Sequence, residues 1–331
     1  MNKESYIDFV LPWVDGSNSV WKERFSQYSG LEGDSQNIRF RNWDLLHYWF
    51  RSIEKFTPWV RYVYFITSGE LPEWVNLNHP KLRWIKHEDY IPAKYLPTFS
   101  ANTIEMNLHR IEELSEHFVY FNDDMFVTGP VKESFFFYKG LPCDSAVMSA
   151  KPADGGIIHM AINDIGVLNK HFDKHKAIKK NPFKWFNFKY GRGLINNILL
   201  YPWMSFSGFV DPHVPNAFLK SVLLNIWEKE SALLDRTCMG KFRTNEDVNQ
   251  WLIRYWQLAE GRFHPVDRLK NSLCTDITDG NMEFIRHIIT NKIYTMICLN
   301  DSNDIHNFEK TKLELHRSFE LLLPEKSGYE K

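Results

Sequence analysis

Short apolar runs alternate with segments of helical periodicity through the first 130 residues, and this alternation restricts the fold more than any other feature. The composition of Tyr6–Val14, Arg61–Thr67 and Phe118–Phe121 predicts three buried strands. Between them, Asn42–Lys55 and Asn102–Glu116 carry apolar residues at helical spacing. Strand, helix, strand, helix, strand is the order of a parallel sheet with helices on its faces. We therefore expect an α/β fold with a Rossmann-like, mostly parallel sheet flanked by helices.

The second half of the chain has a different composition. Residues 136–205 combine an irregular stretch with a lysine-rich one, and helical patterns such as Pro215–Leu234 and Asn245–Glu260 dominate residues 206–331. No low-complexity linker separates these parts. We expect residues 1–135 to form the α/β part, residues 136–205 to be a variable insertion that contributes to acceptor specificity, and residues 206–331 to complete the active site of one catalytic unit.

Composition excludes several classes of function. The formal net charge is −1 over 331 residues, which does not favour nucleic acid as a partner. The four cysteines form no CxxC pair, which fits a reducing compartment without a zinc or disulfide framework. No uncharged run approaches the roughly 20 residues of a membrane span, and the apolar stretch near the N-terminus is too short for a signal peptide. We expect a cytoplasmic protein.

Two adjacent carboxylates interrupt an apolar run in EHFVYFNDDMFVTGP, residues 116–130. In a buried strand Asp123 and Asp124 would be costly unless a cation or hydrogen bonds offset their charge. At the end of a strand the pair could chelate a hard divalent cation such as Mg²⁺. The alternative is a loop in which both side chains accept hydrogen bonds from backbone N–H groups, and the local sequence does not decide between the two.

Polar side chains also follow the first strand and accompany the second helix. Asp15 and Gly16 belong to a turn where the backbone could approach a ligand, or to an ordinary turn. In the Asn102–Glu116 segment, Glu105 and His109 are expected on one helical face. Arg110 beside them could meet a phosphate, although a solvated helix surface explains these residues equally well.

The second half of the sequence contains a candidate general base and a candidate phosphate-binding arginine. His213 is placed in a proline-flanked loop, and histidine is the commonest general base because it titrates near neutral pH. Arg243 precedes Glu246 and Asp247 at the expected start of a helix, where the arginine could hold a phosphate with two hydrogen bonds. The two acidic residues could also serve only to stabilise the helix N-terminus.

Taken together, four blocks of the sequence resemble the Stealth family. The first two family regions are matched by IDFVLPWVDGSN, by RFRNWDLLHYWFRSIEKFTPWVRYVYFITSGELPEWVN and by LPTFSANTIEMNLHRIEELSEHFVYFNDDMFV. The third is matched by HVPNAFLKSV with FRTNEDVNQWL, and the fourth by ICLND. The first block departs from the family pattern, because Asn18-Ser19 stand where Asp-Pro commonly follows Gly-Ser.

The resemblance implies a sugar-1-phosphate transferase of the bacterial type. The donor would be a UDP-hexose or UDP-N-acetylhexosamine, and the acceptor a hydroxyl of an oligosaccharide or lipid-linked saccharide. The attack at the β-phosphorus would release UMP and form a phosphodiester. The resemblance also implies roles for individual residues: His213, Arg243 and Asp124 in catalysis; Asp123, Asp124, Glu246 and Asp247 as ligands of Mg²⁺ or Mn²⁺; and Asp15, Gly16, Arg41, Asn42, Ser100, Asn102, Glu105, Arg110 and Asn122 in donor binding.

Other functions remain open at this point. A conventional glycosyltransferase would use the same donors but release UDP, and a carbohydrate-binding protein would use the many aromatic residues for stacking. The lysine-rich stretch Lys170–Lys184 could contact an anionic polymer or anionic lipid at the inner face of the bacterial membrane, or could be a solvated surface. The sequence does not indicate an oligomeric state.

Overall fold

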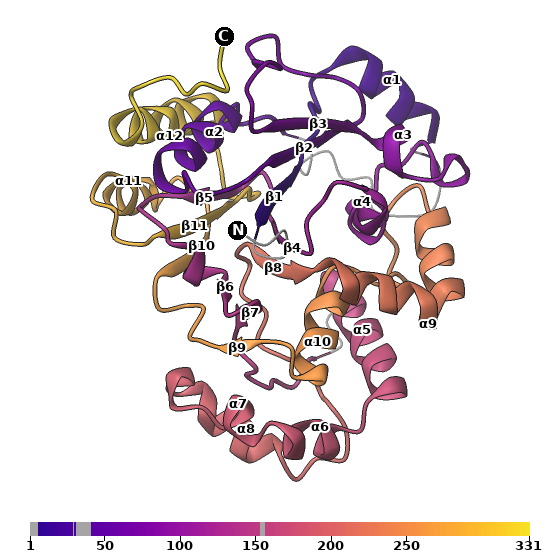
Figure 1. Cartoon of the computed structure of the whole chain (residues 1–331). Coiled ribbons are helices and arrows are strands. Elements are labelled where there is room, and N and C mark those ends of the chain that lie inside the picture. Colours follow the sequence, from indigo (N-terminus) through magenta and orange to yellow (C-terminus); the bar gives the residue numbers. More distant parts are fainter. Residues whose placement is uncertain (1–5, 29, 31–40, 153–155) are drawn as a thin grey trace.

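The computed structural model describes residues 6–28, 30, 41–152 and 156–331. A five-stranded sheet with the order β3-β2-β1-β4-β8 forms its centre (Figure 1). Its strands are β1 (Ile7–Pro12), β2 (Val63–Thr67), β3 (Leu82–Lys86), β4 (His117–Tyr120) and β8 (Asn216–Leu219). The first four are parallel, and β8 runs antiparallel to β4. The predicted α/β fold with a mostly parallel sheet is confirmed.

Strands β1 and β2 lie in the core because helices cover the sheet, as is usual for parallel sheets. Helix α2 (Leu46–Phe56) packs Trp49 edge-on against Phe121, with 5.5 Å between ring centroids, and Phe50 likewise against Phe65 at 5.5 Å. Trp49 and Phe50 are fully buried. Buried rings of this size contribute much of the apolar area that holds a helix to a sheet.

The apolar run that contains the acidic pair does not form one strand. Strand β4 ends at Tyr120, and after a turn β5 (Met125–Val127) joins a separate three-stranded sheet with β10 (Ser272–Asp276) and β11 (Met296–Asn300). The chain therefore passes from one sheet to another at residues 121–124. Asp123 and Asp124 lie in this connection, at the carboxyl end of β4.

Helices and short strands complete the chain. A small sheet consists of β6 (Phe137–Tyr138), β7 (Leu141–Asp144) and β9 (His264–Pro265). The remaining α-helices are α1 (Ser19–Tyr28), α3 (His87–Tyr90), α4 (Ala101–Met106), α5 (Ile157–His171), α6 (Lys174–Lys180), α7 (Pro182–Trp185), α8 (Gly193–Leu200), α9 (Lys220–Met239), α10 (Trp251–Glu260), α11 (Met282–Thr290) and α12 (Phe308–Leu322). The 3-10 turns are η3 (Ala93–Tyr95), η4 (Leu108–Arg110), η5 (Glu133–Phe135) and η6 (Phe188–Tyr190).

Four predicted helices were wrong in extent. The helices predicted from Asn42 and from Asn245 begin at Leu46 (α2) and at Trp251 (α10). The expected helix Asn102–Glu116 ends at Met106, because the side-chain amide of Asn107 donates to the Thr103 carbonyl at 2.8 Å, the acceptor that a continuing helix needs. The segment predicted as helix Pro215–Leu234 begins as β8, since pairing with β4 outweighs its helical propensity.

Helices α5 to α8 and α10 surround a second hydrophobic cluster, separate from the core around the large sheet. Trp185, Phe206, Phe209 and Phe263 are among its fully or almost fully buried rings. Helices α6, α7 and α8 lie together at the lower end of the molecule in Figure 1. We call the segment 174–204 the helical lobe.

A buried carboxylate in α5 makes stability depend on pH. Asp164 is fully buried; its Oδ1 accepts from the Asn249 N–H at 3.2 Å, and its Oδ2 has no partner among the described residues. Burial raises its pKa well above the usual range. An acid whose pKa is raised by folding binds more protons in the native state, so its contribution to stability falls as pH rises above about 4.

Replacement of Asp164 by asparagine is expected to remove this loss. The free energy of unfolding of Asp164→Asn should exceed that of the parent at pH 8, and the difference should shrink towards pH 4. Urea unfolding at several pH values measures this, with the exposed Asp304→Asn as a control. A constant difference between parent and Asp164→Asn across the pH range would contradict the assignment.

Candidate active site

Three amide and imidazole side chains meet at the carboxyl end of β4. His213 lies in the loop before β8, and the antiparallel pairing of Tyr120 with Asn216 brings this loop beside Asn122. The Asn122 amide donates to His213 Nε2 at 2.9 Å, and His213 Nδ1 lies 3.0 Å from Asn300 Oδ1 at the end of β11. His213 is thus held between residues from two different sheets.

These contacts define the protonation of the imidazole. Asn300 Oδ1 accepts the proton of Nδ1, so the lone pair of Nε2 faces Asn122. Burial alone would lower the pKa of His213, but the Cys274 thiol and the charge of Asp124 outweigh this effect and raise it. The lone pair of Nε2 can accept a proton only from a group that replaces the Asn122 amide as its hydrogen-bond donor.

A buried ionic network fixes the loop that carries His213. Arg254 Nη1 donates to Asp211 Oδ1 at 2.6 Å, and Arg254 Nε donates to Asp144 Oδ2 at 2.8 Å. Arg268 contacts Asp144 and donates to the Pro215 carbonyl at 2.8 Å. The loop is therefore held on both sides of His213 by arginines that share Asp144.

The acidic pair lies next to this histidine. Burial raises the pKa of Asp124, while His213 opposes the shift, and Asp124 Oδ1 has no hydrogen-bond partner among the described residues. Asp123 is reached by solvent, yet protein surrounds it closely enough that desolvation, together with the charge of Asp124, raises its pKa to about 7. A bound cation stabilises carboxylates of this kind, and their oxygens suit Mg²⁺.

A second polar cluster lies around Arg243. Glu105 is buried and accepts from Tyr120 Oη at 3.0 Å and from the Gln250 N–H at 3.1 Å; burial raises its pKa, and Arg243 opposes the shift. Arg243 is half-buried and forms no ion pair with any residue that the structure describes. Its charge also opposes the raised pKa of Asp247.

Asn102 and Asp247 belong to the same cluster. The Asn102 amide donates to Asp247 Oδ2 at 3.0 Å, and Asp247 Oδ1 accepts from Thr244 Oγ1 at 2.9 Å. Both oxygens of Asp247 thus hold the 244–247 turn. Glu246 is exposed, and no contact among the described residues joins either of these acids to Asp123 or Asp124.

The turn after β1 contains a third part of the candidate site. Asn42 donates to Asp15 Oδ1 at 3.2 Å, and Gly16 is buried. The side chain of Asn42 thus belongs to this turn, whereas α2 begins at Leu46 with Leu45 as its N-cap residue. Arg41 pairs with Asp301 at 3.2 Å, which joins this segment to the end of β11.

Two predicted donor residues have different surroundings. Ser100 is buried, and its hydroxyl has no partner in the part of the chain that the structure describes. Arg110 is exposed; its Nε donates to Asn107 at 2.9 Å, and its guanidinium lies 5.1 Å from the centre of the Trp227 ring. Glu105 and His109 do not share a helical face, since α4 ends between them.

Residues of β10 and β11 complete the surroundings of His213, and the sequence analysis assigned them no role. Cys274 and Cys298 are opposite each other in parallel register, and their sulfurs lie within 4.8 Å of each other and of a His213 nitrogen. Contact between the two sulfurs lowers the pKa of Cys274, with His213 contributing, and together with burial raises the pKa of Cys298, so Cys274 is the one that favours the thiolate. Thiolates and imidazole suit a soft ion such as Zn²⁺ rather than Mg²⁺. Only the ICLND block hinted at Asn300.

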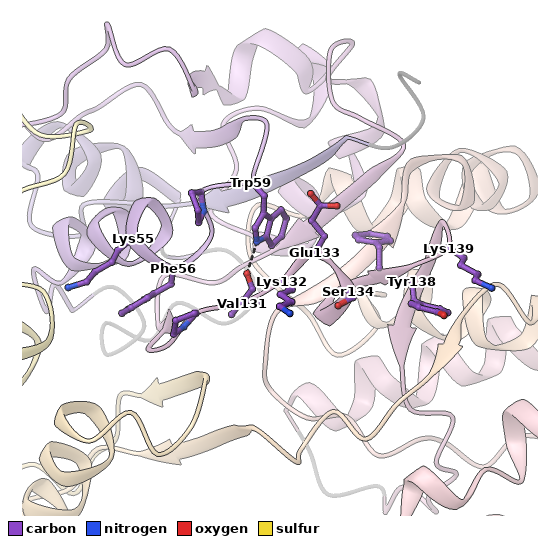
Figure 2. A pocket seen from close by; sticks show the side chains of 12 residues that line it. Lys55, Phe56, Trp59, Val131, Lys132, Glu133, Ser134, Tyr138 and Lys139 are labelled. Carbon is purple, nitrogen blue, oxygen red and sulfur yellow. Dashed lines mark hydrogen bonds between the residues drawn. The ribbon is translucent and has the colours of Figure 1, made fainter. Parts of the chain in front are cut away.

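A cavity of about 650 Å³ lies at the opposite end of the large sheet. Figure 2 shows it between the end of α2 and the segment 130–139, with Trp59 Nε1 donating to the Val131 carbonyl. Trp59 precedes β2, and Phe137 packs on His117 at the start of β4. None of the predicted site residues lines this cavity, so the candidate site is the carboxyl edge.

His213, Arg243 and the carboxylate pair lie towards the carboxyl edge of a mostly parallel sheet, the edge at which such sheets bind ligands. The family model for Stealth protein CR2, conserved region 2, matches residues 39–143. A capsular polysaccharide phosphotransferase WcwK of Streptococcus pneumoniae is 41% identical, with all of both chains covered.

Further relatives agree over nearly the whole length. The exopolysaccharide phosphotransferase cps2G of Lactiplantibacillus plantarum is 38% identical over 98% of this chain and 96% of its own. The receptor polysaccharide phosphotransferase WefC of Streptococcus gordonii is 38% identical over 98% of both chains. The chain therefore belongs to the Stealth family of phosphotransferases.

Proposed function

We propose that the protein transfers a hexose-1-phosphate or N-acetylhexosamine-1-phosphate from a UDP-sugar to a hydroxyl of a growing cell-surface polysaccharide, with release of UMP. The observation that carries this proposal is His213, whose Nε2 faces Asn122 at 2.9 Å beside the two carboxylates. The names of the relatives, which are polysaccharide phosphotransferases, support the acceptor class.

His213 would act as the general base. A sugar hydroxyl is almost fully protonated at neutral pH, so its oxygen becomes a good nucleophile only if a base takes the proton during attack. The hydroxyl would replace the Asn122 amide as the donor to Nε2, and the displaced amide could then donate to the hydroxyl oxygen and orient it. Asn300 would stabilise the imidazolium by keeping the Nδ1 proton in a hydrogen bond at 3.0 Å.

The charges of the site would stabilise the phosphoryl centre. Arg243 would hold phosphate oxygens of the donor, where negative charge spreads during transfer. Asp123 and Asp124 would hold a divalent cation, Mg²⁺ or Mn²⁺, which neutralises the diphosphate when bound. The turn at Asp15, Gly16 and Asn42 would receive the uridine end, since ligands of such sheets bind at the carboxyl ends of the strands.

Nucleotide release tests the proposal. Purified protein is incubated with a panel of UDP-sugars, Mg²⁺ and a cell-surface oligosaccharide, and the products are separated to distinguish UMP from UDP. We expect UMP and a phosphodiester, loss of both on chelation with EDTA, and a strong loss in Asp124→Asn but not in the exposed Asp304→Asn. UDP would instead indicate a glycosyltransferase, and neither nucleotide across a broad acceptor panel would favour a carbohydrate-binding protein.

A further inference from the structure

The helical lobe exposes large apolar side chains to solvent. Phe188 is 90% exposed, and Phe183 and Met204 are each 84% exposed. The exposed apolar residues of the lobe, which we call the apolar patch, are Phe183, Phe188, Ile195, Ile198, Leu199, Trp203 and Met204. Single exposed apolar residues are common, but such a concentration within 22 residues marks a contact surface.

Helix α8 buries an asparagine and exposes several apolar side chains. Asn197 is fully buried, where its amide donates to the carbonyls of Ala146 at 2.8 Å and Trp185 at 2.6 Å. The opposite face presents Ile195, Ile198 and Leu199 to solvent. A helix on a protein surface normally buries its apolar face, so this arrangement indicates an apolar environment outside the protein.

In the rest of the lobe, some aromatic rings are buried and others are exposed. Trp185 is fully buried, and Tyr190 is buried with its hydroxyl donating to the Lys184 carbonyl. Phe183 and Phe188, close to them in sequence, point to solvent. The buried rings anchor the backbone, so the exposed side chains belong to a well-packed segment of the fold.

Cations accompany the apolar patch, and acids are absent. No aspartate or glutamate occurs between Lys174 and Val210. The exposed cations of the lobe are Lys176, Lys179, Lys180, Lys189 and Arg192, and none forms an ion pair with a residue that the structure describes. Lys170, Lys174 and Lys184 of the predicted lipid-contact stretch instead bond to Glu230, the Leu200 carbonyl and the Gly261 carbonyl.

We propose that the helical lobe docks on the surface of an anionic lipid bilayer. Apolar side chains among lysine and arginine are typical of proteins that lie in the membrane interface, where the side chains enter the acyl boundary and the cations attract the headgroups. No helix among the described residues is long and apolar enough to cross a bilayer, so the contact is peripheral. A second copy is a poorer occupant, because the cations would face each other.

Membrane docking would place the proposed reaction at the membrane surface. This consequence rests on the proposed function. The chain continues from Met204 to Asp211 and then His213 within nine residues. Arg254 donates to Asp211 in the network that holds the loop carrying His213. A lobe held at the membrane would therefore keep the active site near a lipid-linked acceptor.

Vesicle flotation tests the docking without donor or acceptor. The full chain is mixed with vesicles of phosphatidylcholine alone, or of equal parts phosphatidylcholine and phosphatidylglycerol. We expect binding to the anionic vesicles only, weakened by salt. The double variant Phe188→Ser/Trp203→Ser should lose most of the binding, and Lys179→Glu/Lys180→Glu should weaken it by roughly five-fold or more per cation.

A control variant and two further results decide whether the exposed apolar residues of the lobe bind the bilayer. Leu313→Ser/Leu321→Ser removes two exposed apolar residues of α12 and should bind like the parent. Failure of the parent to float would overturn the proposal, and so would a loss in the control Leu313→Ser/Leu321→Ser equal to that in Phe188→Ser/Trp203→Ser. So would a concentration-dependent dimer that Phe188→Ser/Trp203→Ser abolishes. With a soluble oligosaccharide acceptor the lobe variants should keep the parent's rate, so absence of UMP formation would count only against the proposed function.

Discussion

Replacement of His213 by alanine is expected to lower kcat by about 10² to 10⁴-fold, the usual contribution of a general base. The imidazole accepts a hydrogen bond from Asn122 at Nε2 and donates one to Asn300 at Nδ1. Alanine would remove both contacts and the basic nitrogen. The rate of UMP formation from a UDP-sugar and an oligosaccharide acceptor measures the effect. KM for the donor should change much less, because the base acts in the transition state.

A conservative variant separates proton transfer from packing. His213→Gln keeps hydrogen-bonding groups in the loop but offers no basic nitrogen, so it should be as impaired as His213→Ala. His287→Ala, which removes an exposed histidine of α11, should behave like the parent. Wild-type rates in His213→Gln would show that another group takes the proton, and unchanged thermal unfolding of both variants would exclude a folding defect.

Arg254→Met is expected to reduce the free energy of unfolding by about 3 to 5 kcal/mol, the usual cost of removing one partner from a buried ion pair. The Arg254 side chain is 1% exposed and contacts both Asp144 and Asp211. Its loss would leave two buried carboxylates with reduced compensation. Urea unfolding at neutral pH gives the measurement.

An exposed arginine provides the matched control. Arg262 pairs with Glu116 at 3.4 Å, and both side chains are more than one third exposed. Arg262→Met should therefore cost no more than about 1 kcal/mol. Similar losses for the two variants would mean that the Arg254 network has no special part in stability. A catalytic defect in Arg254→Met at temperatures where it remains folded would agree with its support of the His213 loop.

Local sequence patterns predicted the secondary structure correctly where a segment is buried in the conformation that its own residues favour. The strands around Phe9, Phe65 and Val119 were predicted because parallel strands covered on both faces need continuous apolar sequence. The predicted helix over Pro215–Leu234 was wrong at its start because only the neighbouring β4 makes an extended conformation favourable there. The polar composition of residues 31–37 predicts a loop, and this segment lies outside the described residues.

The candidate site was predicted in parts but not as an arrangement. His213, Asn122 and Asp124 could be selected because each residue type suits a stated chemistry. Their contact with Asn300, Cys274 and Cys298 depends on the pairing of β11 with both β10 and β5. No spacing along the chain encodes that pairing, so these partners were missed.

The sequence by itself determined the α/β class and the positions of the polar residues at strand ends, because hydrophobic periodicity and turn residues act over a few neighbours. Tertiary structure alone decided which of those ends meet. It placed Asn122, His213 and Asn300 in one hydrogen-bonded set, turned Asp247 towards Asn102, and left the apolar face of α8 uncovered. Long-range strand pairing and core packing bring together residues that are distant in sequence. Local conformational preferences do not specify these contacts.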